Sequence, residues 1–121
     1  MQIDEDGLPG RTKRFALRII NLCEALLNTQ TAHVVRGQLL RSGTSVGANY
    51  RAACCAKSPA DFISKMGTVE EETDESLYWM ELLIEADIVK KDLLSDLMKE
   101  SSEILAMTAA SINTARRNQR K

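Results

Sequence analysis

The sequence contains few of the residues that turn-rich and metal-binding folds require. Only two of its 121 residues are proline and 4% are aromatic, which leaves little material for a fold of many short strands. It has one histidine, His33, and no separated Cys-x-x-Cys pair, whereas a zinc site wants about four His or Cys ligands in suitable pairs. Cys54 and Cys55 are neighbours whose side chains would diverge on a helix, and Cys23 leaves the number odd, so no disulfide framework is expected. We therefore expect an all-α protein without metal or cofactor, in which the cysteines are reduced and buried.

Long hydrophobic runs and a basic leader are also missing. The first ten residues, MQIDEDGLPG, are acidic where a signal peptide would be basic, and every apolar stretch falls well short of the roughly 18 residues of a membrane span. These features predict a cytoplasmic protein with no membrane partner. The length suits a single domain, residues 1–121, with a modest core.

No catalytic constellation can be assembled from the sequence. The segment GTSVG, residues 43–47, lacks the glycine spacing and the Lys-Ser/Thr pair of a phosphate-binding loop. Nucleophilic catalysis by Cys or Ser needs a base, and His33 stands far in sequence from any partner. The acids of residues 70–75 lack the Glu-x-x-His pairs of a carboxylate metal centre in a helical bundle. We expect that the protein is not an enzyme.

Apolar residues recur at alternating steps of three and four, the period of one face of an α-helix. The pattern predicts helices over residues 12–28, 32–57, 59–88 and 92–117, with residues 1–10 as a disordered tail. Short polar links between these helices predict an antiparallel, up-down four-helix bundle. The seam expected along the second helix comprises Val35, Leu39, Ser42, Val46, Asn49 and Ala53.

Capping residues mark the helix boundaries. Thr31 is the candidate N-cap of the second helix, and in KSPADF the residue Ser58 can cap the third, with Pro59 at its first position. The third helix carries apolar side chains on more than one face, among them Tyr78 and Trp79. This surplus exceeds what one four-helix core covers, so we expect either an oligomer or a partner-binding surface, and we prefer the oligomer.

Small and polar residues interrupt the apolar pattern of the second helix. Gly43 and Gly47 each cost about 1 kcal/mol of helix propensity, so we expect close packing of a neighbouring helix there. Ser42 and Asn49 fall on the seam, where polar groups need partners. Removing one partner from the resulting structural network should destabilise the fold by a few kcal/mol. The network expected between the second and third helices comprises Arg41, Ser42, Asn49, Glu72 and Glu75.

The net charge of −1 conceals a strong asymmetry along the chain. Residues 11–57 carry eight Lys or Arg against one Glu, whereas residues 58–88 carry nine acids against one Lys. We prefer to interpret this as a fold or assembly that sets basic helices against an acidic one. The alternative is a basic surface for nucleic acid. Its candidate contacts are Arg11, Lys13, Arg14, Arg18, Arg116, Arg117, Arg120 and Lys121.

The segment QLLRSGTSVGANYRAACCAKSPADFISKMGTVEEETDESLYWMELL, residues 38–83, resembles the central signature of the 23S rRNA intervening-sequence (S23) protein family. After Asn49 many members of that family carry an Ile-Ala-Glu-Gly run, where this chain has Tyr-Arg-Ala-Ala, so it resembles a divergent subgroup. The most specific positions are Gln38, Arg41, Ser42, Ser45, Val46, Asn49, Phe62 and Glu75.

The resemblance implies an antiparallel four-helix bundle that assembles as a ring-like homopentamer, with no enzymatic activity and no established biochemical role. A related branch, the accessory proteins of diversity-generating retroelements, forms similar barrels that bind a reverse transcriptase and nucleic acid. Two functions therefore stay open. One is a structural or scaffold protein that assembles on itself and recruits a protein partner. The other is an accessory protein that binds RNA or a reverse transcriptase through a basic rim, which requires the basic residues of both chain ends to converge.

Overall fold

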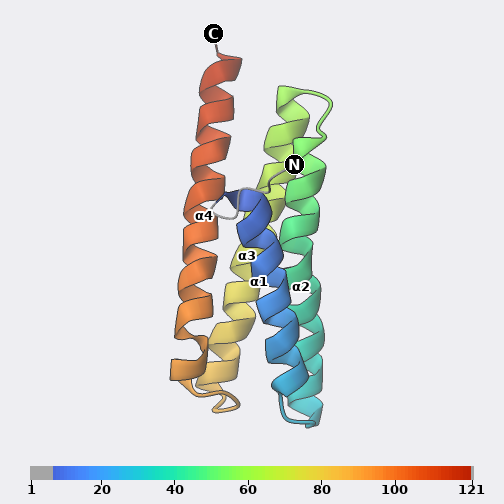
Figure 1. Ribbon diagram of the computed structural model, residues 1–121, viewed down its shortest axis with the longest axis vertical. Helices are drawn as coiled ribbons and strands as arrows, with labels where there is room; N and C mark the ends of the chain where they lie inside the picture. The colour runs from blue at the N-terminus through green and yellow to red at the C-terminus, as the bar shows by residue number, and fades with distance from the viewer. Residues whose placement is uncertain (1–6, 121) are drawn as a thin grey trace.

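Four antiparallel α-helices build the protein, whose computed structural model describes residues 7–120 (Figure 1). Consecutive helices run in opposite directions and are joined by short links, so the predicted all-α, up-down four-helix bundle is confirmed. The helices are α1 (Leu8–Ala25), α2 (Gln30–Cys54), α3 (Pro59–Glu85) and α4 (Lys91–Gln119).

The first helix begins earlier than the sequence pattern predicts. It starts at Leu8 rather than at residue 12, because Pro9 fits the first turn of a helix and Leu8 is buried against the bundle. The predicted disordered tail of residues 1–10 is therefore wrong for residues 8–10, and residues 1–6 lie outside the described part of the chain. The other end of α1 comes three residues early, at Ala25.

Side-chain caps begin α2 and α3. Thr29 accepts a hydrogen bond from the N–H of Ala32 (3.1 Å), so the cap of α2 is Thr29 rather than the predicted Thr31. Ser58 accepts a hydrogen bond from the N–H of Asp61 (3.0 Å), which confirms the cap predicted for α3.

The chain reverses sharply after α3. Asp87 has a φ of 58°, and the N–H of Ile88 donates to the carbonyl of Leu83 (2.9 Å). This is the bond of a Schellman motif, in which the left-handed residue is usually glycine and here is Asp87. The motif ends α3 at Glu85, three residues before the predicted position, and directs the chain back along α3 as α4.

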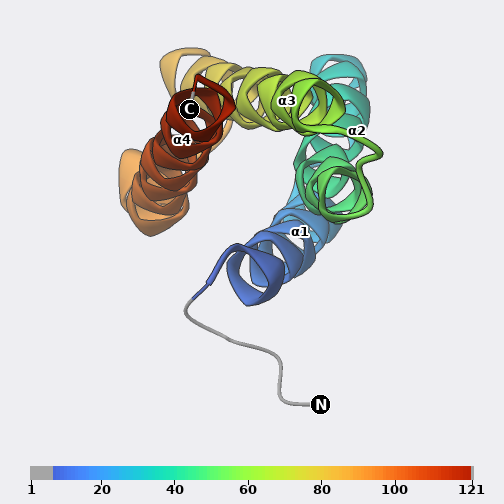
Figure 2. The same ribbon diagram turned by 90° about the horizontal axis from the view of Figure 1, so that it is seen from above.

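Viewed from above, the bundle is an arc with α1 and α4 at its two ends (Figure 2). Helices that are neighbours in sequence pack on each other, most extensively α2 on α3. The shortest helix is α1, with 18 residues against 25, 27 and 29, so it covers only part of the length of the others (Figure 1). It meets α4 along a limited contact and does not approach α3. The arc therefore closes at one small seam, between α1 and α4.

The core combines apolar side chains with buried hydroxyls. Each hydroxyl lies within hydrogen-bond distance of the carbonyl four residues earlier in its own helix, and Ser76 can instead donate to Ser42 on the neighbouring helix. The buried hydroxyl residues are Thr12, Ser42, Thr73, Ser76, Ser101 and Thr108. The predicted seam of α2 is buried at every position except Asn49, which is half-buried.

The close packing predicted at the glycines of α2 is confirmed. A Cβ at Gly43 would lie 2.8 Å from the Cγ1 and Cγ2 atoms of Ile19 on α1, closer than a real Cβ approaches such atoms. A Cβ at Gly47 would lie 3.3 Å from the Oγ1 atom of Thr12. The segment of residues 43–47 is therefore a packing surface for α1.

The prediction of buried cysteines is correct only for Cys23, which is 4% exposed in the core. Cys54 and Cys55 are exposed at the end of α2, where Cys54 lines the groove between α1 and α2. All three cysteines are free thiols, and burial raises the pKa of the Cys23 thiol.

Candidate functional site

An arginine on α2 binds two carboxylates on α3. The guanidinium of Arg41 donates to the two carboxylate oxygens of Glu72 (3.3 and 3.2 Å) and forms a hydrogen-bonded ion pair with Glu75. Trp79 donates its indole N–H to the same Glu75 carboxylate (3.2 Å). Burial lowers the pKa of Arg41, and the two carboxylates raise that pKa by more, so that it lies above its ordinary value. The structure thus brings together three of the residues predicted for the polar network.

This cluster lies at the surface. The side chain of Arg41 is 48% exposed, that of Glu75 is 36% exposed and that of Glu72 is 19% exposed. Water screens charge pairs at such positions, which contribute about 0–1 kcal/mol. The loss of a few kcal/mol predicted for a buried network is therefore too large.

The remaining two members of the predicted network lie elsewhere. Ser42 is fully buried and accepts a hydrogen bond from the hydroxyl of Ser76 across the α2/α3 seam (3.1 Å). Asn49 donates from its amide group to the carbonyl of Ser45 (2.8 Å), one turn back on the same helix, rather than to a carboxylate of α3. The sequence analysis missed Ser76, although it lies three residues after the buried Thr73 and so on the same face of α3.

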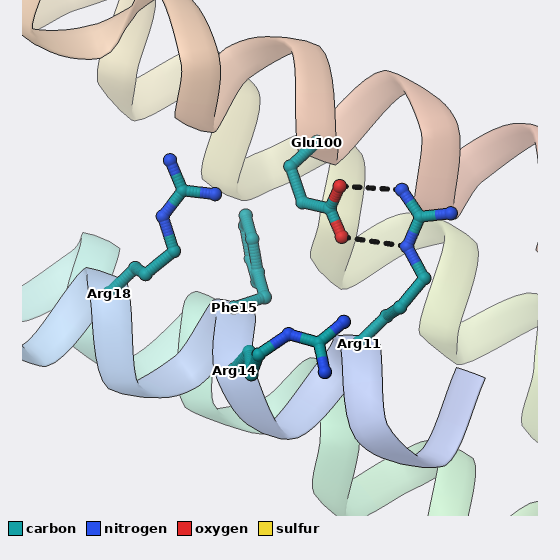
Figure 3. Close-up of a pocket in the computed structure, with 5 residues that line it drawn as sticks. All are labelled: Arg11, Arg14, Phe15, Arg18 and Glu100. Atoms are coloured by element: carbon teal, nitrogen blue, oxygen red, sulfur yellow. Dashed lines mark hydrogen bonds and ion pairs between the residues drawn. The ribbon is translucent and has the colours of Figure 1, made fainter. Parts of the chain in front are cut away.

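A second cluster lies at the seam between α1 and α4 (Figure 3). Arg11 donates from Nε (2.9 Å) and Nη2 (2.5 Å) to the two carboxylate oxygens of Glu100, and it also pairs with Glu103. Arg14 and Arg18 face the same pocket, which has a volume of about 270 Å³. Ion pairs from Arg11 to Glu100 and Glu103 therefore join α1 to α4 at this seam.

The ion pair at this seam shifts both partners. The hydrogen bond from Arg11 is the largest influence on the pKa of Glu100 and holds it below its ordinary value, although burial acts in the opposite direction. The same bond raises the pKa of Arg11. The side chains of Arg11 and Glu100 are only 20% and 18% exposed. The sequence analysis missed Glu100 and Glu103, whose only signal was their spacing of three residues on α4.

The candidate nucleic-acid contacts form two groups. Of the group on α1, Arg11, Arg14 and Arg18 line the pocket beside Glu100, near the middle of α4, whereas Lys13 lines the groove between α1 and α2. The other group is exposed at the C-terminal end of α4, and the 17 residues from Glu100 to Arg117 span about 25 Å of helix. The structure does not bring the two groups to one rim. They are Arg11, Lys13, Arg14 and Arg18 in the first group and Arg116, Arg117 and Arg120 in the second, while Lys121 lies outside the described residues.

An apolar groove of about 600 Å³ runs between α1 and α2. Ala16 lines it from α1, and Thr44, Gly47 and Ala48 line it from α2. Tyr50 stands in the same groove, and burial, together with a hydrogen bond to Cys54, raises the pKa of its hydroxyl to about 12. Tyr50 therefore stays protonated at neutral pH.

The surface features described above are ion-pair clusters and an apolar groove, and neither is a metal site. Within residues 7–120, no three His, Cys, Asp or Glu side chains come together as metal ligands, and His33 is exposed on α2. Over the same residues, none of the helices has both the length and the apolar character needed to cross a membrane.

The chain is similar to known proteins over most of its length. Residues 10–110 match the 23S rRNA-intervening sequence protein family, and no curated protein matches. The crystal structure of a protein of unknown function from the S23 ribosomal protein family of Bacteroides thetaiotaomicron VPI-5482 superposes with a TM-score of 0.83. Its sequence is 39% identical, and the match covers 88% of this chain and 98% of that one. As the resemblance of residues 38–83 predicted, the chain belongs to the 23S rRNA-intervening sequence protein family.

Proposed function

We propose that the protein is a non-enzymatic helical scaffold that assembles on itself as a ring-like homopentamer and recruits a protein partner. The observation that carries the proposal is a set of large apolar side chains that one bundle leaves exposed. They are Leu17 and Ile20 on α1, Leu27 in the link that follows it, Val34 and Leu40 on α2, Tyr78 on α3 and Leu93 on α4.

These side chains come from all four helices, so more than one side of the bundle carries exposed apolar residues. Exposed apolar surface of this kind is typical of protein interfaces. When two different surfaces of one chain meet, copies join head to tail, and such contacts close into a ring if the rotation allows it. The number five rests on the family resemblance.

The mass of the protein in solution tests the scaffold proposal. Light scattering coupled to size-exclusion chromatography should give five times the 13.4 kDa of one chain, with little change on dilution. The double variant Leu17→Ser/Tyr78→Ser should reduce that mass while the helical circular dichroism is retained. A mass of one chain at every concentration contradicts the proposal.

A second candidate is an accessory protein that binds RNA or a reverse transcriptase through basic side chains. Lys13, Arg18 and Arg116 favour it, because they are exposed and form no ion pair with the described residues. The family name, which refers to intervening sequences of 23S rRNA, agrees with an RNA partner.

An electrophoretic shift assay with structured RNA over a salt series tests this candidate. Binding should weaken steeply as salt rises, and Lys13→Ala/Arg18→Ala should flatten that dependence. Arg41→Ala is the matched control, since Arg41 is already bound by Glu72 and Glu75. Absence of a shift at low salt removes the candidate.

A further inference from the structure

The groove between α1 and α2 is long, apolar and open to solvent. The residues that line it on α2 run from Thr44 to Cys54, and these ten steps along the helix span about 15 Å. Ala16 on α1 and the exposed Ala48 on α2 form part of its walls. Its volume of about 600 Å³ lies within the range of small-molecule sites. A groove of this shape fits a linear apolar chain better than a compact ligand.

Each wall of the groove carries a cation. Lys13 on α1 and Arg51 on α2 line the groove, are exposed and form no ion pair with any of residues 7–120. No lining residue is acidic. The one acid on α1 and α2 is Glu24, eleven residues after Lys13 and therefore about 16 Å along the helix, which exceeds the Debye length of about 8 Å at physiological salt. Within the described residues, the groove therefore keeps an excess of positive charge.

Tyr50 and Cys54 line the groove at the C-terminal end of α2. The Tyr50 hydroxyl forms a hydrogen bond with Cys54, whose thiol is free and exposed. The neighbouring thiol of Cys55 is also exposed, but it does not line the groove. The reactivity of these two thiols can therefore distinguish a ligand inside the groove from one bound elsewhere.

We propose that the groove between α1 and α2 binds a linear acyl chain that ends in a carboxylate, which is the chemistry of a fatty acid. The carboxylate lies between Lys13 and Arg51, and the chain lies over Ala16 and Ala48. Burial of the chain is favourable in proportion to the apolar area removed from water, and charge-assisted hydrogen bonds from the two cations orient the head. The groove is formed within one chain, so this site goes beyond the proposed scaffold role and does not depend on assembly.

Isothermal titration calorimetry with decanoate tests the site, with decanol as the uncharged probe and acetate as the probe without a chain. Decanoate should bind about tenfold more tightly than either, because it alone offers both the chain and the charge. The variant Lys13→Gln/Arg51→Gln should weaken decanoate binding by about tenfold and leave decanol binding unchanged. The control Lys91→Gln/Lys99→Gln removes the same charge from exposed positions of α4 and should keep the wild-type affinity.

Further variants test where the chain lies. Ala48→Trp fills the groove from an exposed position and should abolish decanoate binding, while circular dichroism establishes that the variant is folded. In Cys55→Ser, decanoate should slow alkylation of Cys54 by iodoacetamide, whereas in Cys54→Ser it should leave the alkylation of Cys55 unchanged. Equal slowing at both thiols, or decanoate binding that survives in folded Ala48→Trp, would place the ligand outside the groove and overturn the site.

Three other results would also overturn the site. Equal affinities for decanoate and decanol, or undiminished decanoate binding by folded Lys13→Gln/Arg51→Gln, would mean that the two cations do not recognise the head. No heat of binding at millimolar decanoate in any of the proteins would mean that the groove takes no acyl chain. Binding found only in the dissociated variant Leu17→Ser/Tyr78→Ser would identify a second copy of the chain as the occupant of the groove.

Discussion

Two seams of the bundle carry the same charge motif in different surroundings. On the α2/α3 seam Arg41 binds Glu72 and Glu75, and on the α1/α4 seam Arg11 binds Glu100 and Glu103. The side chain of Arg41 is 48% exposed and that of Arg11 is 20% exposed. The α2 and α3 helices also pack extensively, whereas α1 and α4 touch over a limited area.

The difference indicates that an ion pair contributes more to stability where few other contacts hold its two helices together. Along α2 and α3, buried apolar residues and the Ser42–Ser76 pair fix the seam, so a screened pair at its edge adds little. Between α1 and α4 few other contacts exist, and the pair is more shielded from water. The α2/α3 seam should therefore be destabilised most by loss of packing, and the α1/α4 seam by loss of its ion pair.

The largest expected effect comes from a cavity beside the α2/α3 seam. Leu39 on α2 is fully buried, so Leu39→Ala should lower the free energy of unfolding by about 2–5 kcal/mol. The matched control is Leu40→Ala, because the next residue of the same helix is 37% exposed and its truncation should cost far less. Urea unfolding followed by circular dichroism measures both. Equal losses would mean that packing does not dominate this seam.

A smaller loss is expected when the α1/α4 pair is removed. Arg11→Ala leaves Glu100 without its bidentate partner, and should lower the free energy of unfolding by about 1–2 kcal/mol, less at high salt. Arg11→Lys keeps the charge but loses the planar guanidinium fork. Its free energy of unfolding should therefore lie between those of the wild type and of Arg11→Ala.

Hydrogen exchange locates the effect of Arg11→Ala. Because the pair joins the two ends of the arc, amides of α1 should exchange faster in the variant, while those at the centre of the α2/α3 seam should change little. Uniform acceleration in all four helices would argue against a local role for the pair.

The loss of folding stability at low pH, called the acid limb below, should depend on Glu100. Its folded-state pKa lies below the unfolded value of about 4.3, so its contribution is fully present above the unfolded pKa and is lost as pH falls through the folded pKa. Glu100→Gln should therefore unfold with a shallower pH dependence below about pH 4.5. The groups that face Glu100 are Arg11, Arg18 and Glu103.

A carboxylate elsewhere separates this effect from general acid unfolding. The pKa of Asp61 is also lowered, by hydrogen bonds from Lys65 and from the backbone of Lys57, at the start of α3. Asp61→Asn should also flatten the acid limb, but only Glu100→Gln should speed exchange of the α1 amides. If both variants speed that exchange equally, Glu100 does not fasten α1.

Features set by nearby sequence could be predicted. The period of apolar residues located the α2 seam and Ser58 marked the start of α3, since both depend on neighbours within a few turns. Gly43 indicated a close approach of another helix, because a glycine inside a helix costs stability unless close packing needs it. Arg41 could be matched to Glu72 and Glu75 because a short link between antiparallel helices fixes which residues lie opposite.

Features set by closure of the arc could not be predicted. Arg11 and Glu100 are 89 residues apart in sequence, and nothing local to either residue indicates that α1 and α4 meet there. The start of α1 at Leu8 was also missed, because the Pro9-Gly10 pair is typical of loops. Charge placement between ends of the chain is therefore the part of the candidate site that required the structure.

The smallest expected effect is the one that sharpens the comparison most. Arg41→Ala removes the same number of ion pairs as Arg11→Ala, yet should lower the free energy of unfolding by only about 0–1 kcal/mol, since solvent screens it and packing holds the seam. Trp79 shares the Glu75 carboxylate, so its fluorescence should report the lost contact even where stability does not change. A loss as large as that of Arg11→Ala, measured side by side in urea, would mean that the two seams depend on charge equally.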